Sequence, residues 1–311
     1  MSGIARAPLR LTPWPSIARL NVALATCAAM PDGFAADREL KTALEARGAS
    51  GEYVSWDDAS ADWSAFDVVV VRSTFDYSRR RDEFLAWADT LDGRLRNPPA
   101  VLRWNSDKRY LCDLASAGLP VVPTIFVSPG DGQPPLEGEV VVKPTVSAGA
   151  RDTGRFAPGA HDTARALLVD ITRSGRVAMV QPYLPAVDEH GETALVFVAG
   201  QLSHVLRKRA VLAPDEVAPV RDDEIGAAEV MYDDDLVRAS DASSAERELA
   251  SAIVAAVAER FGAPPLYARV DLLAGADGAP TLLELELVEP ALYLAEAPGA
   301  AQRLATAIIS G

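Results

Sequence analysis

Four consecutive valines at positions 68–71 constrain the fold of this chain more than any other feature. A run of β-branched residues without polar alternation is typical of a strand that is buried on both faces of a parallel sheet. An apolar run at 20–26 predicts a second strand, and helical spacing of apolar residues predicts helices over 37–47 and 81–91. This alternation predicts an α/β sheet with right-handed crossovers at the start of the chain.

The rest of the chain has a different pattern, which begins where Asn97-Pro98-Pro99 interrupts the alternation and predicts a domain boundary. Helices are expected over 105–117, over 161–173, and from the capping box of Ser243 and Glu246 to Gly262. Strands are expected over 121–127, 140–142, 178–182, 194–198, 202–209, 267–273 and 281–288. The acidic residues 215–235 are expected to form a mobile excursion.

The acidic composition argues against one class of partner. The formal net charge of the 311 residues is −14, whereas a nucleic-acid-binding protein needs a basic surface for the phosphate backbone. Beyond the N-terminal region, no segment approaches the roughly 20 consecutive apolar residues that span a bilayer, so no membrane partner is expected. Cys27 and Cys112 form no C-x-x-C pair, which favours a reducing compartment and predicts a cytoplasmic protein.

The first residues weakly imitate a secretory signal peptide, because Arg6 and Arg10 precede an apolar stretch at 20–30. Arg19 and Asn21 interrupt any continuous apolar region there. This favours the alternative, in which a buried strand follows a loose segment. Residues 1–18 are therefore predicted to be a flexible extension.

The last expected hairpin carries charged residues at alternating positions. Arg269 and Asp271 share one face of its first strand, and Glu284 and Glu286 share one face of its second strand. Three carboxylates on neighbouring strands repel one another unless a cation lies between them, and oxygen ligands of this kind suit Mg²⁺ with bound phosphate. A strand with an acidic face in solvent is the alternative, and the spacing alone does not decide between the two.

Two lysines are candidates for an anion site. Lys143 ends an apolar strand and precedes a small-residue loop at 147–150, whose backbone N–H groups can approach phosphate oxygens closely. The P-loop motif is absent, and an ordinary turn accounts for the same residues. Lys108 would lie in the first turn of a helix capped by Asn105, where the helix dipole disfavours a cation unless an anion binds. Neighbouring Asp107 offers another compensation.

Two polar segments at strand ends complete the candidate set. The first segment comprises Gln181, Tyr183, Leu184 and Glu192. Its extended backbone can form hydrogen bonds with the edge of an adenine, and its carboxylate can bind ribose hydroxyls. A plain edge strand is the alternative explanation of the same residues. A second cluster directly follows the four valines, at the end of a parallel strand where ligands bind in open α/β sheets. It is a candidate substrate site, with a capped turn as the alternative, and comprises Arg72, Ser73, Thr74, Asp76 and Tyr77.

In this order, these residues resemble those of the ATP-grasp superfamily, and most of all the branch of glutathione synthetases and D-alanine–D-alanine ligases. The latter carry Arg-x-Asp and then Glu-x-Asn thirteen residues after the Asp, the separation of Asp271 and Glu284 here. The resemblance covers about residues 100–290, and residues 20–95 resemble the family's preceding α/β substrate domain. It implies an α/β protein, α+β in its C-terminal lobes, with a substrate domain at 19–100, a central ATP-grasp lobe at 101–179 and a C-terminal lobe with the metal site at 180–311.

The resemblance also implies roles for single residues. Lys143 and Arg269 would be catalytic, with Arg269 stabilising the transferred phosphoryl group. Two Mg²⁺ ions, or Mn²⁺ in their place, would be held by Asp271, Glu284 and Glu286. ATP would be bound by Lys108, Lys143, Ser147, Gly149, Gln181, Tyr183, Leu184, Glu192 and one of Lys208 and Arg209. The substrate would contact the cluster after the valines, Arg151 and Glu289. Glu286 departs from the usual Asn and adds a negative charge beside the metal.

The segments 71–77 and 285–290 resemble a smaller subfamily that includes the cyclo-ligase forming D-cycloserine from O-ureido-D-serine. The implied enzyme is an ATP-dependent carbon–nitrogen ligase of antibiotic biosynthesis. It would convert a small, amino-acid-like carboxylate into an acyl phosphate for attack by an amine nitrogen. The alternatives are an intermolecular carboxylate–amine ligase and a non-catalytic nucleotide-binding protein. The implied partners are small molecules, and a homo-oligomer is left open.

Overall fold

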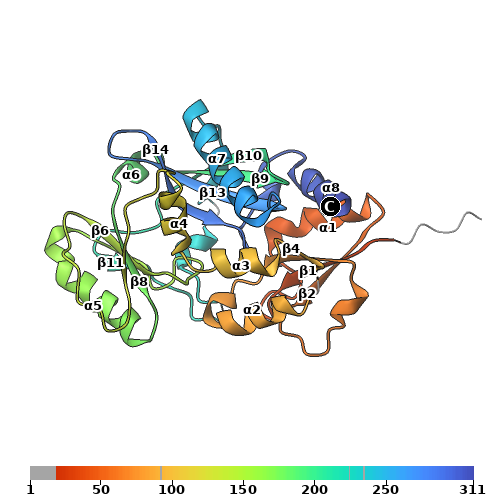
Figure 1. Cartoon of the computed structure of the whole chain (residues 1–311), viewed down its shortest axis with the longest axis horizontal. Coiled ribbons are helices and arrows are strands. Elements are labelled where there is room, and N and C mark those ends of the chain that lie inside the picture. Colours follow the sequence, from red (N-terminus) through yellow and green to blue (C-terminus); the bar gives the residue numbers. More distant parts are fainter. Residues whose placement is uncertain (1–18, 92, 224, 234) are drawn as a thin grey trace, which may run out of the picture.

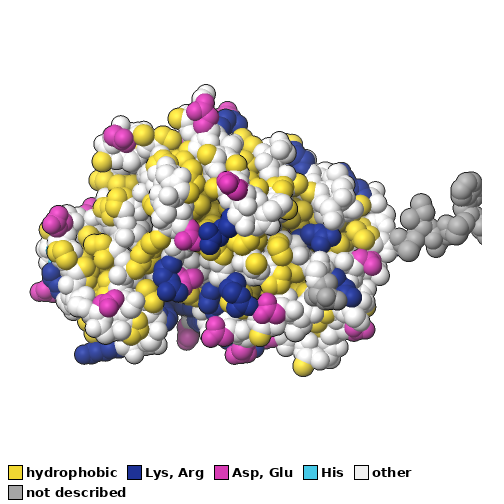
Figure 2. Space-filling view, viewed as in Figure 1, with side chains coloured by type: hydrophobic (Ala, Val, Ile, Leu, Met, Phe, Trp, Pro, Cys, Tyr) yellow, Lys and Arg dark blue, Asp and Glu magenta, His cyan; other side chains and the backbone are white. Residues whose placement is uncertain are grey.

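The computed structural model describes residues 19–311 except 92, 224 and 234, so the extension predicted for residues 1–18 lies outside the described residues. Three sheets are described, and they lie side by side along the long axis of the molecule (Figure 1). On the face shown in Figure 2, basic side chains gather in a small group near the middle, with acidic side chains beside them. Within the described part, every helix is too short or too polar to cross a membrane.

The N-terminal sheet is parallel and has the order β2-β1-β3-β4. Its strands are β1 (Asn21–Thr26), β2 (Ser50–Ser55), β3 (Val68–Ser73) and β4 (Leu95–Arg96). Val68 and Val70 pack toward helices α1 (Arg38–Glu45) and α8 (Ala300–Ser310), whereas Val69 and Val71 pack toward helix α2 (Arg81–Asp89). All four valines are buried, so the predicted strand with two buried faces is confirmed.

The central sheet is antiparallel in its main pairs and has the order β11-β7-β6-β8-β5. Its strands are β5 (Ile125–Val127), β6 (Val140–Pro144), β7 (Gly154–Phe156), β8 (Ala178–Pro182) and β11 (Glu216–Val217). Helix α5 (His161–Arg173) has the predicted bounds and buries Leu168 and Ile171 against this sheet. The sheet therefore has one apolar layer beneath α5.

The C-terminal sheet is antiparallel and has the order β12-β10-β9-β13-β14. Its strands are β9 (Glu192–Val198), β10 (Gln201–Lys208), β12 (Val237–Ala239), β13 (Tyr267–Ala274) and β14 (Pro280–Glu286). Helices α4 (Tyr110–Ser116) and α7 (Ser244–Phe261) pack on it, and α6 (Ala186–His190) precedes β9. The predicted capping box at Ser243 and the left-handed cap at Gly262 bound α7.

Short 3-10 helices connect these elements, and the structure places them at Ala35–Asp37, Trp63–Ala65, Tyr77–Arg79, Pro158–Ala160, Glu229–Tyr232 and Leu294–Glu296. The strand predicted over 121–127 is shorter than expected and begins only at Ile125. Val121 forms an isolated bridge with Leu282, and Pro120 and Pro123 on either side lack the N–H that a longer ladder needs.

The helix predicted over 105–117 forms only in part, because α4 occupies the second half of that range and a separate helix precedes it. Helix α3 (Pro99–Asn105) ends at the residue that was expected to cap a helix, and α4 starts at Tyr110. The Asn105 amide donates to the Leu285 carbonyl at 2.8 Å and accepts from the Leu287 N–H at 2.6 Å. It therefore joins α3 to the end of β14 and cannot cap a following helix.

Candidate active site

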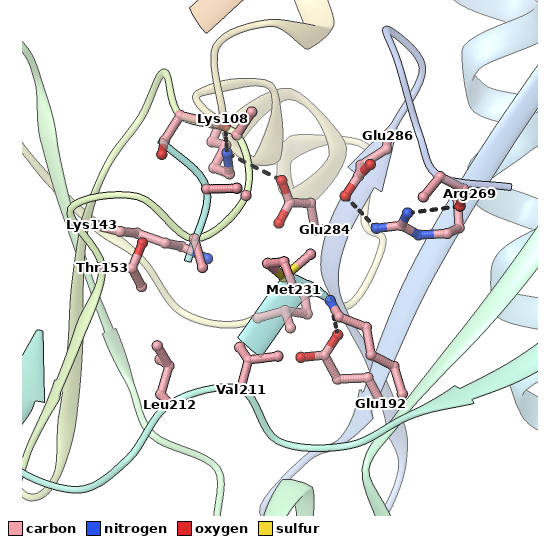
Figure 3. Close-up of a pocket in the computed structure, with 18 of the residues that line it drawn as sticks. Lys108, Lys143, Thr153, Glu192, Val211, Leu212, Met231, Arg269, Glu284 and Glu286 are labelled. Atoms are coloured by element: carbon pink, nitrogen blue, oxygen red, sulfur yellow. Dashed lines mark hydrogen bonds and ion pairs between the residues drawn. The ribbon is translucent and has the colours of Figure 1, made fainter. Parts of the chain in front are cut away.

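A cleft gathers most of the predicted site residues (Figure 3). Its wall contains residues of β6, β8, β10, β13 and β14, together with the loops that follow β1 and β3. Those loops lie at the carboxyl ends of parallel strands, where open α/β sheets bind ligands. The residues predicted for ATP that line the cleft are Lys108, Lys143, Ser147, Gly149, Gln181, Tyr183, Leu184, Glu192 and Lys208.

The β13–β14 pair forms the acidic side of the cleft. Arg269 pairs in register with Glu286, and Asp271 with Glu284, so the four side chains share one face as strand alternation predicted. Arg269 Nη2 lies 2.8 Å from Asp271 Oδ2 and also contacts Glu286. Asp271 is 1% exposed and is not part of the cleft wall. Within the described residues, no three acidic or other ligating side chains converge as a ready metal site, because cationic side chains hold these carboxylates.

Glu284 and Glu286 lie in opposite electrostatic environments. Burial opposes ionisation of Glu284, but the lysines of the cleft outweigh burial and lower its pKa to about 2. Burial raises the pKa of Glu286 to about 7, and repulsion from neighbouring carboxylates adds to this rise despite the attraction of Arg269. A divalent cation stabilises carboxylates that repel one another in this way. A divalent metal ion would therefore stabilise Glu284 and Glu286 in place of the cationic side chains that pair with them here.

Two of the cleft lysines are paired with glutamates. Lys108 Nζ lies 3.1 Å from Glu284 Oε1 and donates to the Ser147 carbonyl at 3.0 Å. Lys208 Nζ lies 3.1 Å from Glu192 Oε2. Burial opposes the charge of this lysine, but Glu192 and Asp271 together outweigh burial and raise its pKa. Figure 3 shows Lys108 and Glu284 pointing toward each other across the cleft. Both lysines therefore add positive charge on the side where Glu284 lies.

Lys143 differs from these two lysines. It is 9% exposed, and no hydrogen bond or ion pair of the described residues reaches its ammonium group, which points into the cleft (Figure 3). Burial lowers its pKa, although Glu284 opposes that shift. A buried cation without a counter-ion is unfavourable, and an anionic ligand would stabilise it. This environment favours Lys143 as a phosphate-binding residue.

The segment predicted to contact adenine lies at the end of β8. The Gln181 amide donates to Thr124 Oγ1 at 2.9 Å. The Arg155 guanidinium lies 3.6 Å from the centre of the Tyr183 ring and donates to the Tyr183 hydroxyl at 2.8 Å. Leu184 completes this part of the wall. These contacts fix the side chains at the wall, and their role toward adenine stays a prediction.

The small-residue loop packs against the acidic segment that was expected to be a mobile excursion. Gly149 has φ of +61°, and a Cβ there would lie 2.6 Å from the Cβ of Ala227. The Ala228 N–H donates to the Gly149 carbonyl at 2.7 Å, and Met231 follows it in the cleft wall. Ile225, Ala227, Met231 and Tyr232 thus line the cleft, so this part of the segment packs against the protein and is not an excursion. Glycine is needed at 149 for both backbone conformation and space.

Arg72 is an internal brace in this structure, and its predicted contact with the substrate stays a prediction. The side chain is 1% exposed and lies outside the cleft wall. Arg72 Nη2 lies 3.0 Å from Asp37 Oδ2 and donates to the Pro290 carbonyl at 2.9 Å. Two buried groups that are distant in sequence therefore meet at this arginine.

The rest of that polar cluster is mostly structural as well. Ser73 Oγ accepts from the Phe34 N–H at 2.9 Å, and Asp76 accepts from the Trp56 indole at 3.0 Å. Thr74 is buried, and its hydroxyl has no hydrogen-bond partner in the described part of the chain. Tyr77 is the member of the cluster that lines the cleft. The strand end was located correctly, but most of its polar side chains face inward.

Arg151 and Arg209 also lie outside the cleft wall, so their predicted roles stay predictions that the cleft lining does not support. Arg151 donates to Ser78 Oγ at 3.2 Å and to the carbonyl of Ile225 at 3.5 Å. Arg209 binds Asp233 and, at 3.3 Å, Asp235. Lys208 is therefore the member of the pair 208–209 that faces the cleft, as strand alternation requires.

The loop after β14, residues 288–293, is held by hydrogen bonds to its carbonyl groups. The four donors are buried and come from three strands, β3, β10 and β13: Arg72 to Pro290 at 2.9 Å, Tyr267 to Val288 at 2.9 Å, Arg269 to Ala291 at 3.0 Å, and His204 to Leu292 at 2.8 Å. Glu289 and Tyr293 of this loop line the cleft. The bonds on both sides of Glu289 fix the path of its backbone.

Comparison with known proteins identifies the family. A family model described as the N-terminal domain of D-cycloserine synthetase DcsG matches residues 22–97. The cycloserine biosynthesis protein DcsG of Streptomyces lavendulae is 37% identical over 275 residues, which are 84% of this chain and 88% of that protein. This chain belongs to the DcsG family. A crystal structure of D-cycloserine synthetase DcsG has a TM-score of 0.83 and 35% identity, over 93% of this chain and 99% of that one.

More distant structures share the fold of the DcsG family. A D-alanine–D-alanine ligase from Bacillus anthracis has a TM-score of 0.63 and 14% identity, over 94% of this chain and 96% of that one. An ATP-grasp RimK domain protein from Sphaerobacter thermophilus has a TM-score of 0.60 and 17% identity, over 92% and 98%. The ATP-grasp fold and an ATP-dependent carbon–nitrogen ligase are thus confirmed, and neither alternative is favoured.

Sequence reasoning missed the apolar side of this DcsG-family cleft. Met30 and Phe34 follow β1 and Phe75 follows β3, and all three line the cleft. The Phe34 and Phe75 rings meet edge to face, with 5.6 Å between their centres. All three residues follow parallel strands, at the edge of the sheet where ligands bind. That position predicted the polar residues after Val71 as site residues, and it could have predicted these apolar residues as well.

Proposed function

We propose that this chain is a cyclo-ligase that uses ATP to close an O-ureido amino acid into a five-membered ring, as in the formation of D-cycloserine from O-ureido-D-serine. The likeness to DcsG supports this proposal, because it extends over most of both chains. The unpaired ammonium of Lys143 gives independent support for a phosphate-bearing co-substrate in this cleft.

The proposed reaction has two chemical stages. A carboxylate oxygen of the substrate attacks the γ-phosphorus of ATP, ADP leaves, and an acyl phosphate forms. The nitrogen bonded to the side-chain oxygen then attacks the acyl carbon, phosphate leaves and the ring closes. Hydrolysis removes the carbamoyl group. The nucleophile belongs to the same molecule, so positioning replaces the binding of a second amine.

The nucleotide would lie along the basic side of the cleft. We assign the phosphates to Lys143, Lys108 and Lys208, with loop 147–150 providing N–H groups through Ser147 and Gly149. We assign the adenine to Gln181, Tyr183 and Leu184, and the ribose to Glu192. Lys208 already neutralises Glu192, so the nucleotide must rearrange this ion pair when it binds.

The acidic side would hold the divalent metal. Glu284 and Glu286 line the cleft and would be ligands, and Asp271 would join them when Arg269 releases it. Two Mg²⁺ ions, or Mn²⁺ in their place, would neutralise the charge of the phosphates when bound. The released Arg269 guanidinium would then stabilise the negative charge of the transferred group.

The division of the chain into segments 19–100, 101–179 and 180–311 is part of the same proposal. The first would carry the substrate end of the cleft and the other two the nucleotide end. Cys27 and Cys112 are free thiols, which supports a reducing cytosolic location. A small carboxylate is the proposed partner.

The test is a turnover assay with purified protein, ATP, Mg²⁺ and O-ureido-D-serine. Phosphate release without any added amine, together with D-cycloserine detected by mass spectrometry, is the expected result. Phosphate release that requires a second amine would show an intermolecular ligase instead. Absence of turnover with O-ureido-D-serine would refute the proposed substrate.

A further inference from the structure

The charged side chains that line the cleft form ion pairs with oppositely charged side chains, with two exceptions. The matched groups are Lys108 with Glu284, Lys208 with Glu192, and Arg269 with Asp271 and Glu286. The ion pairs of the described residues include neither Lys143 nor Glu289, although both line the cleft. Lys143 lies where the nucleotide phosphates are proposed to bind. Glu289 is thus an acidic group for which the described protein supplies no ion-pair partner.

Glu289 lies in surroundings that disfavour its negative charge. It follows Val288, which is 2% exposed, and burial raises the pKa of the Glu289 carboxyl well above its usual range. The charge of Glu286 adds to this rise. Tyr77, which is 5% exposed, lines the same cleft, and Glu289 is the first of the charges that raise the pKa of its phenol after burial. A cationic ligand group would relieve this accumulation of negative charge.

The backbone on both sides of Glu289 is fixed. The Val288 carbonyl is bonded to Tyr267, and the Pro290 carbonyl is bonded to Arg72. Arg269 holds the carbonyl of Ala291, two residues after Glu289. The carboxylate is therefore presented to the cleft by a braced loop, which is the arrangement that a preorganised binding group requires.

We propose that Glu289 binds the α-ammonium group of the substrate and selects amino acids over carboxylic acids that lack the amine. This inference rests on the proposed function, because it takes the carboxylate near Arg269 as the group that is phosphorylated. An α-amino acid carries its ammonium and its carboxylate on one carbon, and Arg269 contacts the loop that carries Glu289, because it donates to the Ala291 carbonyl at 3.0 Å. Tyr77 lines the same wall, and an aromatic ring attracts a nearby ammonium group.

A direct role of Glu289 as a metal ligand is the competing interpretation. Glu289 lies beyond the end of β14 at Glu286, so it does not belong to the alternating face of Glu284 and Glu286. A metal ligand would change the Mg²⁺ requirement for every substrate. An ammonium-binding group would change only the reaction of substrates that carry the amine, and this difference defines the experiment.

The experiment compares O-ureido-D-serine with 3-(ureidooxy)propanoic acid, which lacks only the amine, by phosphate release with ATP and Mg²⁺. Wild-type protein should prefer the amine by about 10- to 100-fold in kcat/KM, the range of a charge-assisted hydrogen bond. Glu289→Gln should lose that preference, with an unchanged rate for the analogue and unchanged dependence on ATP and Mg²⁺. Glu296→Gln, an identical change at an exposed position, should behave as wild type.

Three results would overturn the inference: no preference in the wild type, an equal loss on both substrates in Glu289→Gln, or a higher Mg²⁺ requirement in that variant. If the wild type turns over neither compound, the proposed function fails, and calorimetry decides the ammonium site separately. D-serine and 3-hydroxypropanoate are then titrated into protein with a non-hydrolysable ATP analogue. Binding of D-serine alone, lost in Glu289→Gln, supports the site, and equal binding or no binding of both refutes it.

Discussion

Replacing Arg72 by methionine should lower the free energy of unfolding by about 3–5 kcal/mol, because it leaves a buried carboxylate without its partner. Arg72 and Asp37 each have 1% side-chain exposure and lie 3.0 Å apart. Burial raises the pKa of Asp37 even beside the guanidinium. The cost of removing this carboxylate from water therefore exceeds the attraction of the pair, and an unpaired Asp37 must be costlier still.

The double variant Asp37→Leu with Arg72→Met provides the internal check. Replacing a buried ion pair by apolar groups of similar size is often neutral or stabilising, because both desolvation costs disappear. The Pro290 carbonyl still loses its donor, at a cost of about 1 kcal/mol. The double variant should thus recover most of the loss in stability. The less firmly held loop after β14 should nevertheless raise the KM for the amino-acid substrate.

The assay is urea denaturation followed by circular dichroism, with the slope against urea checked for two-state behaviour. Arg103→Met is a matched control, since Arg103 and Asp89 form an exposed pair at 2.7 Å with side-chain exposures of 53% and 52%. That change should cost no more than about 1 kcal/mol. A similarly small cost for Arg72→Met, or a double variant as unstable as the single one, would refute the reasoning.

Three further predictions address the cleft and its support. Lys143→Met should lower kcat/KM for ATP by about 100- to 1000-fold, without loss of thermal stability, because burial already lowers the pKa of this ammonium. Gly149→Ala should destabilise the protein by more than the about 1–2 kcal/mol of backbone strain, since its Cβ would lie 2.6 Å from that of Ala227. Burial lowers the pKa of His204, so the unfolded chain binds the proton more readily. The stability that His204 contributes above its unfolded pKa of about 6.5 should begin to be lost below that pH and be fully lost once the pH has fallen through the lower pKa of the folded state.

Each of these predictions has a control. An unchanged ATP dependence in Lys143→Met would remove that residue from the phosphate site. Gly118→Ala has a similar φ, +82°, with no neighbour within 4 Å, so equal effects at 118 and 149 would show that packing against Ala227 is unimportant. His204→Gln should flatten the decrease of melting temperature between pH 8 and pH 5.5, and an unaltered decrease would contradict the role of His204.

The fold was largely accessible from the sequence because the decisive signals are local. The valines at 68–71 and the alternation around Arg269 and Glu284 each specify a strand and its buried face within a few residues. Asn105 shows where local reasoning fails. Asparagine favours helix caps, but its amide here binds backbone groups of β14 about 180 residues away, and nothing local reports that partner.

The site was predictable in position more than in detail. The strand end after Val71 is at the cleft, yet Arg72 turns inward to Asp37, a pairing across 35 residues that the sequence does not reveal. Asp271 was chosen correctly as a member of the charged face but is held by Arg269. Which charges pair with each other depends on distances between sheets, and these are set only when the whole chain has folded.

The packing of α8 on the N-terminal sheet has a consequence for biosynthesis. Leu304 and Ile308 of this helix belong to the same apolar cluster as Leu24 and Val68, although nearly the entire sequence separates them. A ribosome completes the N-terminal strands long before residues 300–310 emerge. One apolar face of the N-terminal sheet therefore stays exposed until α8 is synthesised. A chaperone that binds exposed apolar surfaces would bind the nascent chain during that interval.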